Sequence, residues 1–364
     1  DIVNMRVARH LNAPVLLIAD IDRGGALASL VGTLALLTEE ERALVKGLII
    51  NKFRGDVGLL QPAVDFLEEK TGKPVLGIVP HIENIGIDDE DSVSLEEKQA
   101  DKKERDLHIA VIRTPKISNF TDFVCLAGEA DVSLYYVTEV KELGQPDLIL
   151  LPGSKNTTED MMYLRDSGLE SAIQTAVAKG TPLMGICGGY QMLGEEIRDP
   201  HHTESSYDGV KGMGLLEMTT TFSPEKLTSQ VEADCHDWPF LGTKISATGL
   251  KGYEIHMGET SFTGTDDCHP LTITRRAGET CAVTEGTGRA DGLIFGTYIH
   301  GIFDHDEFRR QILNALRQKK GLPPLTSTRS VAAEKQRSYD QLAAVVRRSI
   351  DMDKIRAIMG LGSK

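Results

Sequence analysis

A lone cysteine between glycines is the residue of this sequence best placed for nucleophilic chemistry. Cys187 follows a short apolar run over 182–186 and precedes Gly188, Gly189 and a helical stretch. We predict a tight strand-to-helix turn with Cys187 at its apex, in a strained backbone conformation that only small neighbours permit. At a helix start the thiolate is favoured over the thiol, and the Gly188 N–H would face a developing oxyanion. The alternative interpretation is a buried structural cysteine.

A thiolate that attacks a carboxamide needs a base that takes up a proton and passes it to the departing ammonia. Of the ten histidines, His256 and His300 lie at the ends of predicted strands. We favour His300, because the glycine after it lets the ring face an open cleft. A structural histidine is the alternative. Gly153, in the loop after a predicted strand, offers a second backbone N–H to the same oxyanion unless that loop is an ordinary turn.

Apolar runs alternate with helical stretches along the first part of the chain, which predicts a parallel sheet. The expected strands cover 14–20, 47–50 and 74–80, and the expected helices cover 26–37 and 59–70. Asn51 and Lys52 follow the second strand, at the edge where such sheets bind ligands. This pair resembles the base-recognition corner of P-loop proteins, and a solvated strand end is the alternative. The sequence contains no GxxxxGK[ST] loop.

A second alternating series positions the cysteine and the histidine. We predict strands over 107–113, 132–137 and 147–151, and helices over 122–128, 169–179 and 306–319. Beyond residue 193 we expect glycine-rich loops and short strands, which include 252–258 and 281–284. One or two amphipathic surface helices are expected over 338–359.

Length and charge narrow the class of protein. A chain of 364 residues predicts two or three domains. The net charge of −14 argues against a nucleic-acid partner, and no apolar run or signal peptide indicates a membrane. Five scattered cysteines without a CxxC pair indicate neither a disulfide framework nor a metal site. They fit a reducing, cytoplasmic location.

These motifs resemble the class I, triad-type glutamine amidotransferases. The resemblance rests on three segments, Leu151–Lys155, Gly185–Leu193 and Gly296–Gly301. It implies that Cys187 forms a γ-glutamyl thioester, with His300 as its base. It also implies Gly153 and Gly188 as the oxyanion hole and Gln191 near the L-glutamine substrate. That family commonly has Glu two residues after the histidine, where this chain has Ile302, so either another acid orients the imidazole or the site works as a dyad.

Within that class the chain is similar to the cobyric acid synthase family, on the segments Val15–Gly25, Ile49–Asp56 and Gly252–Gly258. The resemblance implies an α/β protein with a P-loop, dethiobiotin-synthetase-like amidoligase domain and a flavodoxin-like glutamine amidotransferase domain. The implied reaction uses ATP and Mg²⁺ to activate corrinoid side-chain carboxylates for amidation in cobalamin biosynthesis. It converts adenosylcobyrinic acid a,c-diamide to adenosylcobyric acid, without a bound organic cofactor or structural metal.

We therefore expect a partial amidoligase domain over 1–87, a charged linker over 88–106, an amidotransferase domain over 107–322 and a helical extension over 323–364. Since no phosphate-binding loop is present, we expect the chain to be truncated at its N-terminus and to retain at most the glutaminase half. Nucleotide contacts are expected at Asn51 and Lys52. The alternatives are cobyrinate a,c-diamide synthase or a related amidoligase, a flavodoxin-like cysteine hydrolase, and a non-catalytic module.

Overall fold

The computed structural model describes residues 3–83, 85–87, 104–264, 267–326 and 329–362. They belong to two compact units, one formed by residues 1–87 and 333–364 and the other by residues 88–332. The linker predicted over 88–106 lies for the most part outside the described residues. The final helices, which sequence reasoning set apart as an extension, group with the first unit.

The first unit contains a three-stranded parallel sheet in the order β1-β2-β3, as the alternating pattern predicts. Buried aliphatic side chains on one face of it pack against helices α2 and α4. The elements from residue 1 to 87 are α1 (Asn4–Leu11), β1 (Val15–Asp20), α2 (Ala26–Leu36), α3 (Glu39–Leu44), β2 (Val45–Phe53), η1 (Val57–Leu60), α4 (Gln61–Thr71) and β3 (Val75–Pro80).

The C-terminal helices, α12 (Val331–Ser349) and α13 (Met352–Ile358), complete this unit. A second apolar cluster joins Val345, Ile355 and Ile358 to β2 and β3. The segment between the two helices pairs with β3, and the Asp351 N–H donates to the Leu76 carbonyl at 2.8 Å. The first unit is thus built from both ends of the chain.

The second unit is built on a seven-stranded sheet in the order β14-β17-β18-β9-β7-β4-β6. Neighbours from β18 to β6 are parallel, whereas β17 and β14 are antiparallel. The strands are β4 (Leu107–Ile112), β6 (Val132–Val137), β7 (Leu148–Leu151), β9 (Leu183–Ile186), β14 (Asp267–Cys268), β17 (Thr287–Arg289) and β18 (Ile294–Thr297). The helices are η2 (Phe120–Phe123), α6 (Val124–Ala127), α7 (Val140–Leu143), α8 (Thr157–Asp166), α9 (Leu169–Ala178), α10 (Gly188–Leu193), η3 (Ile302–Asp304) and α11 (Asp306–Lys319).

Beyond residue 193, the short strand expected over 281–284 is present, but the one expected over 252–258 is part of a much longer strand. The chain there forms one long antiparallel hairpin from β12 (Met218–Phe240) and β13 (Thr243–Phe262). Register shifts interrupt the pairing at three places, so the alternation of apolar and polar residues does not run evenly along either strand. The hairpin belongs to a sheet that also contains β10 (Glu196–Arg198), β11 (Gly209–Lys211), β15 (Leu271–Arg276) and β16 (Glu279–Glu285). A small ribbon pairs β5 (Ile117–Ser118) with β8 (Gly153–Ser154).

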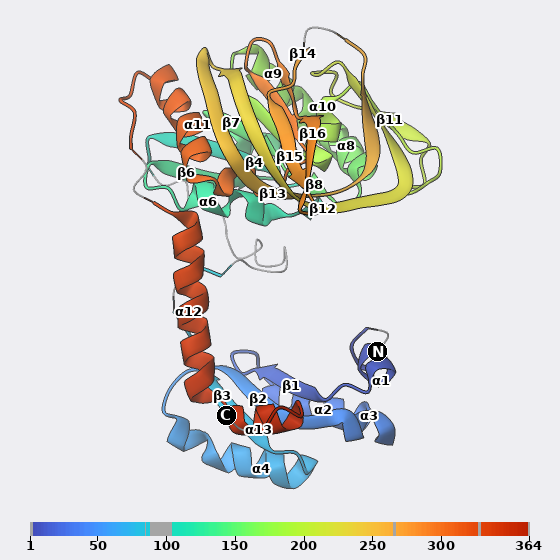
Figure 1. Cartoon of the computed structure of the whole chain (residues 1–364), viewed down its shortest axis with the longest axis vertical. Helices are drawn as coiled ribbons and strands as arrows, with labels where there is room; N and C mark the ends of the chain where they lie inside the picture. The colour runs from blue at the N-terminus through green and yellow to red at the C-terminus, as the bar shows by residue number, and fades with distance from the viewer. Residues whose placement is uncertain (1–2, 84, 88–103, 265–266, 327–328, 363–364) are drawn as a thin grey trace. The chain divides into compact units, whose positions relative to one another are not determined.

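Two apolar layers enclose the parallel sheet. One lies between the sheet and the second sheet with α11, and contains Ile109, Val231 and Ile312. The other packs the opposite face against α8 and α9, with Met161 and Ile173. Figure 1 shows the long strands of the hairpin crossing in front of β4 and β7. The loops at the carboxyl ends of β7, β9 and β18 then carry the candidate site.

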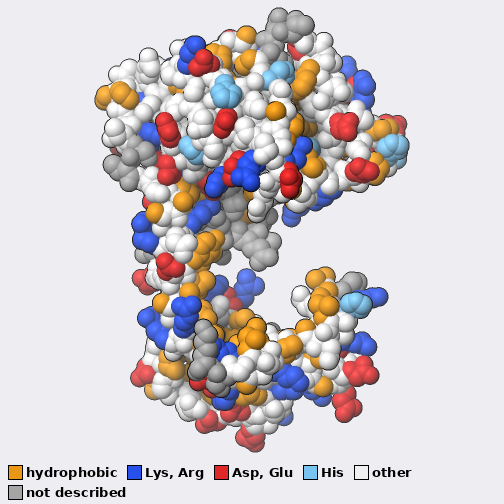
Figure 2. Space-filling model, viewed as in Figure 1, with side chains coloured by type: hydrophobic (Ala, Val, Ile, Leu, Met, Phe, Trp, Pro, Cys, Tyr) orange, Lys and Arg blue, Asp and Glu red, His pale blue; other side chains and the backbone are white. Residues whose placement is uncertain are grey.

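Acidic and basic side chains are interspersed over the face of the second unit seen in Figure 2. The whole chain has 54 acidic residues against 40 basic ones. Within the described residues, no helix combines the length and the apolar character that crossing a membrane requires.

Candidate active site

Cys187 lies at the apex of the predicted strand-to-helix turn, between the end of β9 and the start of α10. Its φ of 53° and ψ of −110° place an L-residue in a strained region of backbone space. A Cβ atom on Gly185 would lie 2.5 Å from the Gly189 carbonyl oxygen, and one on Gly189 would collide with the Leu151 carbonyl. The strained apex and the need for small neighbours are thus confirmed.

His300 forms a buried pair with an acid that sequence reasoning did not assign. The His300 Nδ1 atom lies 2.7 Å from Oδ2 of Asp122, while Oδ1 of the same carboxylate accepts the Gly301 N–H at 2.9 Å. Both side chains are buried. Because Nδ1 is committed to Asp122, Nε2, which also lies 3.1 Å from the side-chain nitrogen of Asn119, is the ring nitrogen left for proton exchange with the thiol. The family commonly has a Glu two residues after this histidine. In this chain Asp122, in η2, provides the carboxylate that orients the ring.

Ile302, where the family commonly has Glu, lies in the apolar layer between the two sheets and is 1% exposed. A carboxylate at this position would be buried among apolar side chains. Asp122, by contrast, reaches the imidazole from η2. Asp122 is 178 residues from His300 in the chain. The only signal in the sequence was an acid near the start of the expected helix over 122–128.

The environment of His300 favours its protonated form. Burial alone disfavours the charge, but attraction to Asp122 and the hydrogen bond with it outweigh burial, and the Cys187 side chain adds to their effect. Together they raise the pKa of His300 to about 10. The protonated His300 ring can donate its proton to a leaving amine. Its positive charge would also stabilise an adjacent anionic sulfur.

The segment Gly252–Gly258 of β13 forms one wall of the site. Tyr253 exchanges two backbone hydrogen bonds with His300 and stacks on its ring, with centroids 5.0 Å apart. Two residues later, the Ile255 carbonyl accepts a contact from Cys187 Sγ at 3.5 Å. The sequence analysis used this segment for the family resemblance, as an expected strand and for His256; the structure brings it into contact with both proposed reacting residues.

Gly153 and Gly188, the expected oxyanion-hole residues, both border the site. A Cβ on Gly153 would lie 3.3 Å from Cε1 of His300, and a Cβ on Gly188 would lie 2.9 Å from the backbone nitrogen of Ser154. The two loops therefore approach each other beside the imidazole. This arrangement supports a role for their N–H groups at one oxyanion.

Gln191, expected near the substrate, directs its buried side chain into contacts with its own chain. Its Oε1 accepts the Thr157 hydroxyl at 3.1 Å, and its Nε2 donates to the Met257 carbonyl at 3.1 Å. Gln191 thus ties α10 to α8 and to β13. It lines the cavity, but its amide is already engaged.

His256, the other histidine considered as a base, stacks on Tyr298 with ring centroids 3.8 Å apart. Neither of its ring nitrogens finds a hydrogen-bond partner among the described residues. Burial lowers its pKa to about 4. The ring is therefore neutral at neutral pH and, unlike His300, has no carboxylate to orient it.

Cys187, Gln191, Ile255 and His256 line a cavity of about 400 Å³, and the His300–Asp122 pair lies behind Cys187 rather than in the cavity wall. Its wall also carries Glu204 and two lysines, Lys155 and Lys226. The cavity is lined entirely by residues of the second unit.

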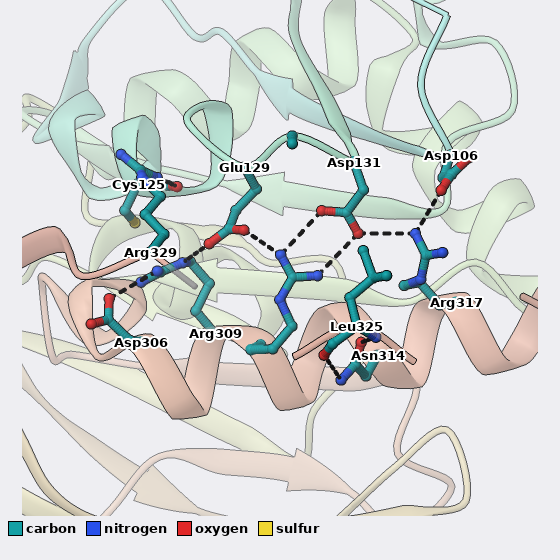
Figure 3. Close-up of polar contacts among 12 residues, drawn as sticks. Asp106, Cys125, Glu129, Asp131, Asp306, Arg309, Asn314, Arg317, Leu325 and Arg329 are labelled. Carbon is teal, nitrogen blue, oxygen red and sulfur yellow. Dashed lines mark hydrogen bonds and ion pairs between the residues drawn. The ribbon is translucent and has the colours of Figure 1, made fainter. Parts of the chain in front are cut away.

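A buried ion-pair network anchors the two segments that carry Asp122 and His300 (Figure 3). Arg309 of α11 binds Glu129 at 2.7 Å and Asp306 at 2.9 Å, and Arg310 contacts Glu129 and Asp131. Glu129 follows Asp122 by seven residues, and Arg309 follows His300 by nine. The network thus holds α11 against the loop that follows η2 and α6.

Asn51 and Lys52, the expected nucleotide contacts, lie in the first unit at the end of β2. Asn51 is paired in register with Asp20, and the Lys52 ammonium binds the Asp20 carboxylate at 2.7 Å. A polar strand edge of this kind is compatible with a nucleotide. The residues that the structure describes contain no group of three His, Cys, Asp or Glu side chains able to hold a metal ion.

Comparison with known proteins agrees with this division of the chain. Residues 108–308 match the CobB/CobQ-like glutamine amidotransferase domain family, and residues 1–87 match an AAA domain family. Among solved structures, PurLQS from Thermotoga maritima is similar over 59% of this chain and 99% of its own, with 16% identity and a TM-score of 0.45.

Curated relatives match over almost the full length. Cobyric acid synthase from Moorella thermoacetica is 50% identical over 363 residues, which is 99% of this chain and 70% of the relative. Cobyric acid synthase from Klebsiella pneumoniae is 48% identical over 367 residues, again 99% of this chain and 70% of the relative. These matches cover the strand-to-helix turn at Cys187, the buried His300 and both halves of the sequence. The chain belongs to the cobyric acid synthase family.

Proposed function

We propose that the second unit hydrolyses the side-chain amide of L-glutamine and supplies ammonia for the amidation of carboxylates. The observation that carries the proposal is that Cys187, which lines a cavity, interacts with the His300 side chain, and that the His300 ring is paired with Asp122. A strained nucleophile, a base and an acid that orients the base are the parts that amide hydrolysis through a thioester requires.

In the first step the Cys187 sulfur attacks the carboxamide carbon, and the carbonyl π electrons move to oxygen. The N–H groups of Gly188 and Gly153 donate to that oxyanion. Collapse of the tetrahedral intermediate breaks the C–N bond while His300 Nε2 gives its proton to the leaving nitrogen. The products are ammonia and a γ-glutamyl thioester on Cys187.

In the second step His300, now neutral, takes a proton from a water molecule that attacks the thioester carbon. The C–S bond breaks, glutamate leaves and the sulfur returns to its anionic form beside the reprotonated imidazole. Asp122 accepts the Nδ1 hydrogen bond throughout and holds the ring so that Nε2 faces the sulfur.

We further propose that the ammonia amidates corrinoid side-chain carboxylates, as expected for a member of this family. A carboxylate is a poor electrophile, so ATP is the co-substrate that converts it to an acyl phosphate with a good leaving group. The AAA-type first unit, with Asn51 and Lys52 at its strand edge, is where we place the nucleotide.

Ammonia release from glutamine, measured for the chain and for Cys187→Ala, tests the glutaminase proposal. We expect release by the wild type and none above background in the variant. Cys281→Ala, which removes a half-buried thiol of β16, is the matched control and should keep full activity. Peptide mapping after reaction with 6-diazo-5-oxo-L-norleucine should find the adduct on Cys187. Equal ammonia release by wild type and Cys187→Ala would overturn the assignment.

A further inference from the structure

Glu204 is a carboxylate in the cavity wall that the steps above do not use. It lies in the loop after β10, and the buried Asp199 shapes this loop by accepting the N–H groups of Thr203, Glu204 and Ser205. The Glu204 carbonyl accepts the side-chain amide of Asn156 at 2.9 Å, which fixes the loop to the start of α8. The position of Glu204 is therefore set by the fold on both sides.

The Glu204 carboxylate accepts one backbone hydrogen bond, from the Thr157 N–H to Oε2 at 3.0 Å. In the described part of the chain it forms no ion pair with Lys, Arg or His. Burial raises its pKa to about 6, even though the contacts with Thr157 lower it. A carboxylate held in a cavity wall without a cation is costly unless a ligand supplies the missing charge.

Thr157 connects Glu204 to the helix that begins at the nucleophile. Thr157, which binds Glu204 through its N–H, also donates its hydroxyl to Gln191, one helical turn after Cys187. A Cβ on Gly188 would lie 3.1 Å from that same Thr157 hydroxyl. In an extended glutamine, the amide carbon and the α-nitrogen are about 5 Å apart, from ordinary bond lengths. One amino acid can thus place its amide at Cys187 and its ammonium near Glu204.

The charges of the cavity match a zwitterion. Among its described lining residues Glu204 carries the one carboxylate, and Lys155 and Lys226 carry two ammonium groups. Both lysines are exposed, so they can move toward an α-carboxylate at the cavity mouth. We propose that Glu204 binds the α-ammonium group of glutamine and is the residue that selects an α-amino acid over other primary amides. This inference rests on the proposed glutaminase function and adds the group that determines specificity.

The test compares L-glutamine with glutaramate, which keeps the amide and the carboxylate but lacks the α-amino group. We expect the wild type to hydrolyse glutaramate with a kcat/KM at least about 100-fold below that of glutamine, because the half-buried carboxylate is left unpaired. In Glu204→Gln the KM for glutamine should rise about 10- to 100-fold, since a charge-assisted hydrogen bond becomes a neutral one. Its kcat should change little, and its preference for glutamine over glutaramate should largely disappear.

Glu159→Gln, an exposed change on α8, is the matched control and should leave the KM unchanged. Binding of glutamine to Cys187→Ala and to Cys187→Ala/Glu204→Gln, measured by calorimetry, separates recognition from chemistry. Iodoacetamide, which has no charge, should alkylate Cys187 equally in the wild type and in Glu204→Gln.

A wild type that releases no ammonia and a Cys187→Ala variant that binds no glutamine would overturn the proposed function, and this inference with it. An active wild type that uses glutaramate as well as glutamine would overturn the inference alone, and that result does not depend on whether any variant folds. An unchanged KM in Glu204→Gln would do the same. Glu204→Asp, which keeps the charge on a shorter side chain, should recover part of the preference for glutamine.

Discussion

Two residues of the site have conformations or charges that isolated side chains avoid. Cys187 has a positive φ that costs roughly 1–3 kcal/mol in an L-residue. His300 is fully buried, yet its environment favours the charged ring. Both are maintained by neighbours, the glycines in one case and Asp122 in the other. Asp122 therefore contributes to the proposed chemistry by setting the orientation and charge of the imidazole.

Asp122→Asn should reduce kcat for glutamine hydrolysis by about 10²- to 10⁴-fold, because the ring loses both its orientation and the charge that stabilises its protonated form. Once the carboxylate is gone, burial dominates, so the pKa of His300 should fall from about 10 to well below that value. NMR titration of the histidine ring nitrogens, with His300→Gln to assign the signal, measures this shift. A His300 signal that titrates alike in Asp122→Asn and the wild type would contradict the pairing.

The same pair contributes to stability with a defined sign. Since the folded pKa of His300 is raised, its contribution is complete below the unfolded pKa of about 6.5 and is lost as the pH rises through about 10. The free energy of unfolding of the wild type should therefore decline over this window. Asp122→Asn should lack that part of the decline.

The sequence was sufficient to find Cys187 and His300, because each lies in a local pattern of glycines next to an apolar strand. It was not sufficient to find Asp122. No local pattern marks this aspartate, and its role depends on a contact with a residue 178 positions away. Ile302, where the family commonly has Glu, showed only that an orienting acid would have to come from elsewhere in the chain, and this position is buried among apolar side chains.

At the scale of elements, the site depends on α11 being held beside the η2–α6 segment. Its boundaries, Asp306–Lys319, agree with the sequence prediction, since an amphipathic pattern identifies a helix well. The β12–β13 hairpin shows the opposite case. Its register shifts fall inside the strands, so the pattern breaks into short pieces although the pairing continues.

Arg309→Met should destabilise the second unit by about 3–5 kcal/mol, because it leaves buried Glu129 with one cation fewer and removes the contacts to Asp306. Urea unfolding followed by tryptophan fluorescence measures the change, since Trp238, the one tryptophan of the chain, lies in the core next to α11. Lys244→Met, which breaks an exposed pair with Asp237, is the control and should cost less than about 1 kcal/mol. Equal effects of the two changes would show that the network adds no more than a surface ion pair.

At the scale of the whole molecule, the chain separates the proposed glutaminase from the unit that is similar to AAA domains. All residues that line the cavity belong to the second unit, whereas the first unit combines residues 1–87 with the C-terminal helices. The amphipathic pattern over 338–359 indicated that these helices need an apolar partner. It did not identify the partner, because β3 is more than 250 residues away in the chain.

The Gly77→Ala change tests this separation. Gly77 pairs with Ile350, and a Cβ at position 77 would lie 2.8 Å from the Ile350 Cα and closer still to the Ser349 carbonyl. Since backbone atoms cannot yield as a flexible side chain does, we expect the segment between α12 and α13 to be displaced, at a cost of about 1–3 kcal/mol to the first unit. Hydrogen exchange should accelerate in β3 and over 350–358. Ammonia release from glutamine should keep its wild-type kcat and KM, because no residue of the cavity is touched.

Gly72→Ala, at a helix end with open space around it but a positive φ, controls for a general effect of replacing glycine in this unit. If Gly77→Ala lowered glutaminase activity while Gly72→Ala did not, the two units would be coupled through the C-terminal helices. The glutaminase activity would then depend on the first unit, contrary to this prediction.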